Sequence, residues 1–124
     1  MAQLRLLIVE DDVDQRELIR ETLEQHFGEG TTVGVGSVNE ALAQSLDAFD
    51  LILSDYNLLD GTGIELMQAV HRRCDTPVIM VTGENVVQIA AEAISKGATD
   101  YVVKDGEYLV TIPLVVQKTC RGGR

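Results

Sequence analysis

Five short apolar runs divide the chain, and a segment with helical periodicity follows each of them. The four strongest runs cover residues 4–9, 51–53, 78–81 and 101–103. They are apolar almost without interruption, which is typical of strands buried on both faces of a parallel sheet. Residues 31–35 form a weaker fifth run, whose threonines and internal Gly34 favour an edge strand.

Helical patterns fill the intervals between the runs. The helix predicted over residues 13–27 has an apolar face at i, i+4 spacing, made of Leu18, Ile19, Leu23 and Phe27. Ser37 and Glu40 form the signature of a capping box at the start of the next helix. Gly97 is predicted to stop a helix over residues 86–96.

The last helix is predicted over residues 114–118, with Pro113 in its first turn. Residues 109–116 are strongly apolar, so part of this segment must face the sheet, and any exposed remainder suggests a binding or dimer surface. Residues 121–124 are expected to form a frayed tail.

The alternation of strands and helices, repeated five times, predicts an α/β domain. Such alternation gives a parallel sheet with helices on both faces. The 124 residues suit one domain, and no linker or internal repeat divides them. We therefore expect a single domain over residues 1–124, whose strand order these patterns alone do not determine.

Composition narrows the possible partners and the cellular compartment. Twenty acidic residues against ten basic ones give a formal charge of −10, which disfavours direct contact with nucleic acid or an anionic membrane. Cys74 and Cys120 form no disulfide framework, and no apolar stretch approaches the length of a membrane span. We expect a cytoplasmic protein.

Each strong apolar run ends in a distinctive polar residue. Glu10, Asp11 and Asp12 follow the first run, Asp55 the second at one residue's remove, Thr82 the third and Lys104 the fourth. The carboxyl ends of parallel strands meet at one edge of the sheet, which is where ligands bind in open α/β folds. The sequence thus predicts carboxylates, a hydroxyl and an ammonium in one crevice.

This set of side chains fits phosphoryl transfer assisted by a divalent cation. Clustered carboxylates repel one another unless a cation such as Mg²⁺ joins them. Asp55 is then a candidate nucleophile, with Lys104 and Thr82 contacting phosphoryl oxygens. Each residue also has a simpler structural interpretation: Asp55 as a turn residue, Thr82 as a helix cap, and Lys104 as a solvated charge. We expect Asp12 to cap the first helix rather than to bind metal.

Four segments in this order resemble the receiver domain of bacterial two-component response regulators. They are residues 6–12 (LLIVEDD), 51–57 (LILSDYN), 81–83 (VTG) and 101–104 (YVVK). The resemblance covers essentially the whole chain. It implies a flavodoxin-like (βα)5 three-layer sandwich, with the five strands in the order 2-1-3-4-5.

The resemblance also implies roles for individual residues in a signalling switch rather than an enzyme. Asp55 would take a phosphoryl group from the phosphohistidine of a histidine kinase or histidine phosphotransfer protein. Mg²⁺ or Mn²⁺ would be held directly by Asp11 and Asp55, by Glu10 through water, and by the backbone carbonyl of Asn57. Thr82 and Lys104 match the phosphate-contacting pair.

Four further positions have roles implied by the resemblance. Tyr101 matches the aromatic residue that moves inward when Thr82 shifts, and Gly83 matches a position that is kept small. Asn57 and Glu84 match positions that set the lifetime of the phosphate. The output would reach a downstream protein target, or an output domain fused to this one. Asp105 replaces the proline that often follows the lysine, and we expect a trans bond there.

Two other functions remain open at this point. A phosphatase of the haloacid dehalogenase type also uses an aspartate nucleophile, but the second aspartate of its DxDGT pattern is absent after Asp55, and Asp60-Gly61-Thr62 is displaced from it. A receiver fold that only binds partners, without being phosphorylated, is the other alternative.

Overall fold

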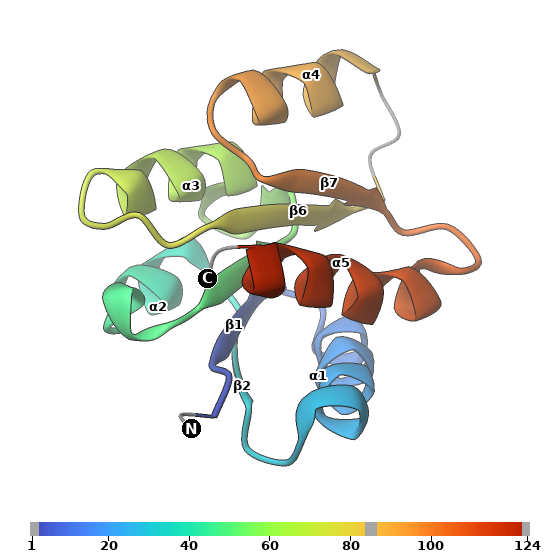
Figure 1. Cartoon of the computed structure of the whole chain (residues 1–124). Helices are drawn as coiled ribbons and strands as arrows, with labels where there is room; N and C mark the ends of the chain where they lie inside the picture. The colour runs from blue at the N-terminus through green and yellow to red at the C-terminus, as the bar shows by residue number, and fades with distance from the viewer. Residues whose placement is uncertain (1–2, 84–86, 123–124) are drawn as a thin grey trace.

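A five-stranded parallel sheet lies between two layers of helices in the computed structural model, which describes residues 3–83 and 87–122 (Figure 1). The strand order is β2-β1-β3-β6-β7, and every neighbouring pair in this sheet is parallel. Its members are β1 (Leu6–Val9), β2 (Thr32–Val35), β3 (Leu51–Ser54), β6 (Val78–Thr82) and β7 (Asp100–Val103). This confirms the flavodoxin-like class and the order 2-1-3-4-5 of the five main strands.

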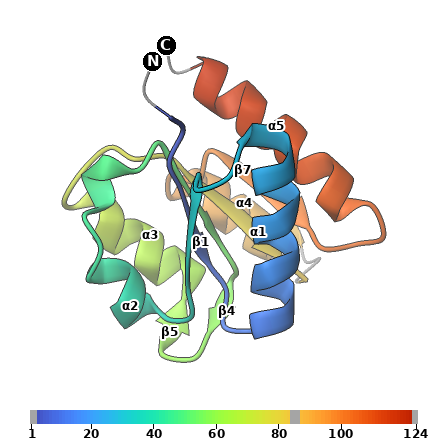
Figure 2. The ribbon, with the colours of Figure 1, turned by 90° about the horizontal axis from the view of Figure 1, so that it is seen from below.

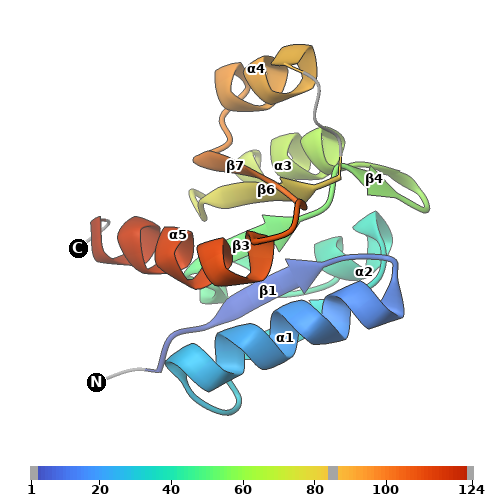
Figure 3. The same ribbon diagram turned by 90° about the vertical axis from the view of Figure 1, so that its right-hand side faces the viewer.

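The helices divide between the two faces of the sheet. Helices α1 (Val13–Phe27) and α5 (Tyr108–Gly122) lie side by side on one face, as Figures 2 and 3 show. The opposite face carries α2 (Val38–Leu42), α3 (Gly63–His71) and α4 (Val87–Ser95), with a 3-10 turn (Leu46–Ala48) before β3. Gly97 follows α4 with a φ of 118°, as expected for a residue that ends a helix.

The apolar core forms two clusters, one on each face of the sheet, because side chains alternate along every strand. In β1, Leu6 and Ile8 pack with Ile19 of α1 and the α5 side, while Leu7 and Val9 pack with the helices of the opposite face. All four β1 residues are buried. Because side chains alternate along a strand, a strand covered on both faces must be apolar throughout, which is the pattern seen in the sequence.

Two details of the helices differ from the sequence prediction. Leu18 is 42% exposed and does not share the buried face of Ile19 and Leu23. Neighbouring helical residues point about 100° apart, so only one of the pair can face the sheet. The last helix begins at Tyr108, which makes the first-turn position predicted for Pro113 wrong.

Packing explains why α5 extends through its proline. Pro113 has no N–H to donate to the preceding turn, which normally weakens a helix. The helix nevertheless buries Ile112 and Val116 completely against the sheet. Most helical stability in proteins comes from such contacts. On the same helix Val110 and Leu114 remain 64% and 60% exposed, so the predicted exposed remainder is present, and the binding or dimer surface stays a prediction.

A short antiparallel hairpin of β4 (Asn57–Leu58) and β5 (Gly61–Thr62) follows β3 and was not predicted. Its turn residue Asp60 accepts hydrogen bonds from the backbone N–H groups of Val38 and Asn39, at 2.8 and 3.0 Å. The carboxylate of Asp60 therefore caps α2 from a distant part of the chain.

The capping pattern also differs at two helices. Ser37 caps α2, but Glu40 bonds the N–H of Gly36 rather than that of Ser37, so the predicted capping box is incomplete. A complete capping box joins Thr62 and Glu65 at the start of α3. In the described parts of the chain, no helix combines the length and apolarity needed to cross a bilayer.

We predict that Asp60→Ala lowers the free energy of unfolding near neutral pH. The bonds from Asn39 and Val38 lower the pKa of Asp60 below its ordinary value, because they favour the carboxylate. This contribution is present above the ordinary pKa and is lost as the pH falls through the lowered pKa. Urea unfolding at neutral pH and near pH 3 should show a difference from wild type that shrinks with acidification.

Asp75→Ala is the matched control, because it removes the same charge from an exposed residue between α3 and β6. An equal loss of stability in both variants, or a loss in Asp60→Ala that persists in acid, would contradict the capping role.

Candidate functional site

The sheet itself brings the predicted residues to one edge. Backbone bonds extend the ladder just past the strands: Glu10 N–H donates to Val35 O, and Asp55 N–H donates to Val9 O, each at 3.0 Å. Lys104 N–H donates to Thr82 O at 2.8 Å. The backbone N–H groups of these site residues therefore continue the hydrogen bonding of the strands that precede them.

Three carboxylates converge at this edge. One oxygen from each of Glu10, Asp11 and Asp55 lies within 4.8 Å of the others. Glu10 is buried, whereas Asp11 and Asp55 are half-buried. The acids that follow the apolar runs at residues 4–9 and 51–53 therefore lie close together, as predicted.

The ammonium of Lys104 joins two of these carboxylates. Its Nζ donates to Oε1 of Glu10 in a short contact and to Oδ2 of Asp55 at 3.1 Å. Burial lowers the pKa of Lys104, but the bond to Glu10 and the charges of Asp55 and Glu10 outweigh it and raise that pKa above its ordinary value. Lys104 therefore stays charged and compensates the two acids.

Glu10 is the most perturbed acid of the cluster. Burial of its side chain raises its pKa to about 7, and the nearby charge of Asp55 adds to the effect against the opposing bond from Lys104. Strongly shifted acids in a cleft of charged groups are typical of functional sites. A divalent cation, in addition to the ammonium of Lys104, would reduce the electrostatic repulsion between these acids.

Asp12 takes the structural role expected for it. Its Oδ1 accepts bonds from the N–H groups of Asp14 and Gln15, at 2.9 and 3.2 Å, so it caps α1. Its own N–H donates to Oε2 of Glu10 at 3.2 Å. The cap of the helix thus also helps to orient the buried acid.

Two other predicted residues, Thr82 and Asn57, lie at strand ends. Thr82 is buried at the end of β6 and pairs in register with Val103. Asn57 begins β4, two residues after Asp55. The Lys104–Asp105 bond is trans. Glu84, the second predicted lifetime residue, lies outside the described residues.

Tyr101 lies in β7 opposite Met80 of β6. It is half-buried and packs against the core on the side of α2, α3 and α4. Among the described residues, no heavy atom lies within 4 Å of the position where a Cβ on Gly83 would lie.

Gly63 is a site-positioning residue that the sequence analysis did not single out. Its N–H donates to Tyr56 O at 2.7 Å, which closes the loop after Asp55. A Cβ on Gly63 would lie 2.3 Å from the carbonyl oxygen of Asp55 and 2.8 Å from Sδ of Met80. Its only sequence signal was a glycine eight residues after Asp55.

The sequence did not indicate a role for Tyr108 or Gln15 beside the site. The Tyr108 hydroxyl donates to Oε1 of Gln15 in a short contact that links α5 to α1. Burial raises the pKa of Tyr108, and the charges of Glu10, Asp12 and Asp55 add to this effect, whereas Lys104 lowers it. This tyrosine therefore lies within electrostatic reach of the acidic cluster.

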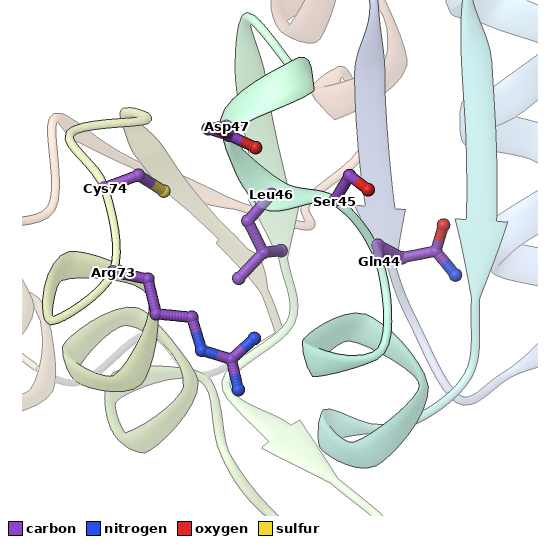
Figure 4. A pocket seen from close by; sticks show the side chains of 6 residues that line it. All are labelled: Gln44, Ser45, Leu46, Asp47, Arg73 and Cys74. Atoms are coloured by element: carbon purple, nitrogen blue, oxygen red, sulfur yellow. The ribbon is translucent and has the colours of Figure 1, made fainter.

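Two further features lie away from the cluster. Asp60, whose Asp-Gly-Thr segment resembled part of a phosphatase motif, is bound to the backbone of α2. A pocket of about 290 Å³ lies between the loops that precede β3 and β6, away from Asp55 (Figure 4). Its Arg73 donates to Leu42 O at 2.8 Å and so ties the α3 end to α2.

The donor set of the cluster suits a hard divalent cation. Mg²⁺ and Mn²⁺ prefer carboxylate, carbonyl and water oxygens, and Mg²⁺ in proteins commonly uses one or two carboxylates. Glu10, Asp11 and Asp55 offer three convergent oxygens, two of them from half-buried and so accessible side chains. The residues present therefore fit such an ion.

Comparison with known proteins agrees with this geometry. A family model described as the response regulator receiver domain matches residues 6–110. The response regulator protein PilR of Pseudomonas aeruginosa is 36% identical over 106 residues, which cover 84% of this chain and 23% of that protein. FleR, a response regulator protein of the same organism, is 35% identical over 115 residues, covering 91% and 24% respectively.

Solved structures of receiver domains share this fold. The receiver domain of NtrX from Brucella abortus superimposes with a TM-score of 0.83 at 28% identity, covering 94% of this chain and 98% of that one. The chain thus spans about a quarter of the length of the two curated relatives but nearly all of an isolated domain.

We predict that Gly63→Ala destabilises the protein by about 1–3 kcal/mol or more, because overpacking against a fixed backbone cannot relax easily. The new methyl group would press on the carbonyl of Asp55. Denaturant unfolding measures the loss. Gly83→Ala is the control at the same edge of the sheet, where the added methyl meets open space. Equal stability of the two variants would contradict the close approach at Gly63.

Proposed function

The chain belongs to the response regulator receiver domain family, and from this membership we propose that Asp55 is the phosphoacceptor of its signalling switch. Receiver domains of this family have a phosphorylation-dependent signalling role. The observation that carries the assignment to Asp55 is its carboxylate, half-buried at a strand end beside two other acids and bound to Lys104. The function is a switch, and not turnover of a substrate.

The transfer step requires one bond to form and one to break. An oxygen of Asp55 attacks the phosphorus of a phosphohistidine whose other ring nitrogen carries a proton. The P–O bond forms, and the P–N bond breaks with its electron pair on the imidazole, which keeps that proton. The product is an acyl phosphate on Asp55 and a neutral histidine. The catalytic requirement is positioning and charge compensation, which the fixed backbone of Asp55 and the ammonium of Lys104 supply.

Glu10, Asp11, Asp55 and the backbone carbonyl of Asn57 would hold Mg²⁺ or Mn²⁺, with Glu10 acting through water. The ion supplies positive charge to the phosphoryl oxygens when it is bound. In the structure Lys104 bonds Glu10 and Asp55. With the phosphoryl group present, Lys104 would bond one of its oxygens, and Thr82 would donate to another.

Phosphorylation would be converted into a change of surface through Thr82 and Tyr101. The phosphoryl group adds about 1.5 to 2 negative charges at a site that is already acidic. A shift of Thr82 toward it would leave room for Tyr101 to move inward, and the face formed by α4, β7 and α5 would change. A partner that distinguishes the two states completes the signal.

We infer the partners from membership of the receiver family. A histidine kinase or a histidine phosphotransfer protein donates the phosphoryl group in the cytoplasm, and a downstream protein or a fused output domain reads the switched face. The charge of −10 disfavours direct contact of this domain with nucleic acid or an anionic membrane.

We predict that a small phosphodonor such as acetyl phosphate, with Mg²⁺, adds one phosphoryl group of about 80 daltons to the wild type and none to Asp55→Asn. Intact-mass spectrometry measures the product. A wild type that gains no mass would support a binding module that is never phosphorylated, and a gain that persists in Asp55→Asn would move the acceptor elsewhere.

We predict that substitutions at Asn57 and Glu84 change the lifetime of the acyl phosphate without abolishing its formation. Asn57 begins the hairpin two residues after Asp55, and its side chain is exposed. Decay of the phosphorylated species, followed by mass spectrometry after removal of the donor, gives the lifetime. Identical lifetimes in both variants and the wild type would refute this role.

A further inference from the structure

Arg16 on α1 connects the acidic cluster to the edge strand of the sheet. Its Nη1 donates to the backbone carbonyl of Glu10 at 2.9 Å, in a partly buried contact. We propose that Arg16 is a positioning residue for the metal site, and that Gly34 is a glycine so that Arg16 can reach Glu10. This inference rests on the proposed metal-binding role of the cluster.

The path of the Arg16 side chain supports the second half of the proposal. A Cβ at Gly34 would lie 3.1 and 3.2 Å from Cδ and Cγ of Arg16, and one at Gly36 would lie 3.0 Å from its Nη1. The aliphatic part therefore passes closely over the glycines of β2 and the segment that follows. This close passage would explain why the edge strand β2 contains a glycine.

The contact made by the guanidinium of Arg16 supports its role as a positioning residue. The N–H of Glu10 donates to Val35 O, and its carboxylate accepts from Asp12 N–H and from Lys104. Arg16 holds the remaining backbone group, the carbonyl. The peptide that joins Glu10 to Asp11 is therefore anchored by Arg16, and both carboxylates project from it.

If Arg16 is a positioning residue, its removal should change the affinity for Mg²⁺ in the direction opposite to that expected from the loss of its charge alone. Removing a cation near an acidic cluster should tighten the binding of Mg²⁺. Removing a group that holds the ligands in place should weaken it, and substitution of such outer partners typically costs 10–100-fold in metal affinity. The direction of the change thus separates the two explanations.

Arg20 provides a matched control on the same helix. It lies one turn after Arg16 and also reaches β2, where its Nε donates to Oγ1 of Thr32 at 3.1 Å. Its ion pairs are with Glu17 and Glu24 of α1. Arg20→Met removes the same charge and keeps a similar aliphatic chain, as does Arg16→Met, but only the latter removes the donor to Glu10.

The experiment is a calorimetric titration of the full chain with MgCl2, with thermal unfolding of each variant measured in parallel. We expect Arg16→Met to weaken Mg²⁺ binding about tenfold, at the lower end of the usual range because its contact is to backbone. Arg20→Met should bind as tightly as wild type or slightly more tightly. Arg16→Lys, which keeps a charged donor, should recover part of the affinity.

A second measurement tests the glycine. Gly34→Ala should weaken Mg²⁺ binding in the wild-type background, because its methyl group displaces Arg16. The same substitution should have little effect on affinity when Arg16 is already methionine. This coupling, measured as a double-mutant cycle, would not arise from a general loss of stability.

The outcomes distinguish this inference from the proposed function. Glu10→Gln serves as the reference for a damaged metal site. A wild type that binds no Mg²⁺ would defeat the proposed metal site itself. Binding that is weakened by Glu10→Gln but unchanged or tightened by Arg16→Met, or weakened equally by Arg20→Met, would overturn the positioning role of Arg16 alone.

Discussion

The site depends on the compensation of clustered negative charge. Carboxylates of Glu10, Asp11 and Asp55 converge within 4.8 Å, and like charges so close together oppose folding unless a cation joins them. Lys104 supplies that cation by bonding Glu10 and Asp55 across the ends of the strands. In the proposed switch, a phosphoryl group or a divalent ion entering the site would redistribute these bonds and so carry a local chemical event to β7 and α5.

The rest of the fold keeps the acids in place while this balance changes. Backbone bonds continue the sheet ladder through Glu10, Asp55 and Lys104, so the charged residues are extensions of buried strands rather than parts of long loops. Gly63 lets the start of α3 lie against the carbonyl of Asp55. Sites supported by regular elements and packed neighbours hold their geometry better than sites on unsupported loops.

Local patterns predicted much of this architecture. The five parallel strands, the bounds of α1 and the capping of α1 by Asp12 follow from hydrophobic periodicity and helix-end chemistry. The run at residues 101–103 was predicted to be buried on both faces, but it lies in the edge strand β7, where only Val102 is buried. The hairpin of β4 and β5 was not predicted, because its strands have two residues each and are too short for a periodic signal. The start of α5 at Tyr108 was missed because Pro113 suggested the first turn of a helix, whereas packing of Ile112 and Val116 decided the outcome.

The sequence by itself determined the class of fold and the types of group at its active edge, since strand ends can be located from apolar runs and parallel strands end together. Only the tertiary structure decided which groups touch. The bonds of Lys104 to Glu10, of Arg16 to the Glu10 carbonyl, and of Asp60 to α2 join residues from different elements. Such contacts depend on how the layers pack, and a one-dimensional pattern carries no information about side-chain distances across that packing.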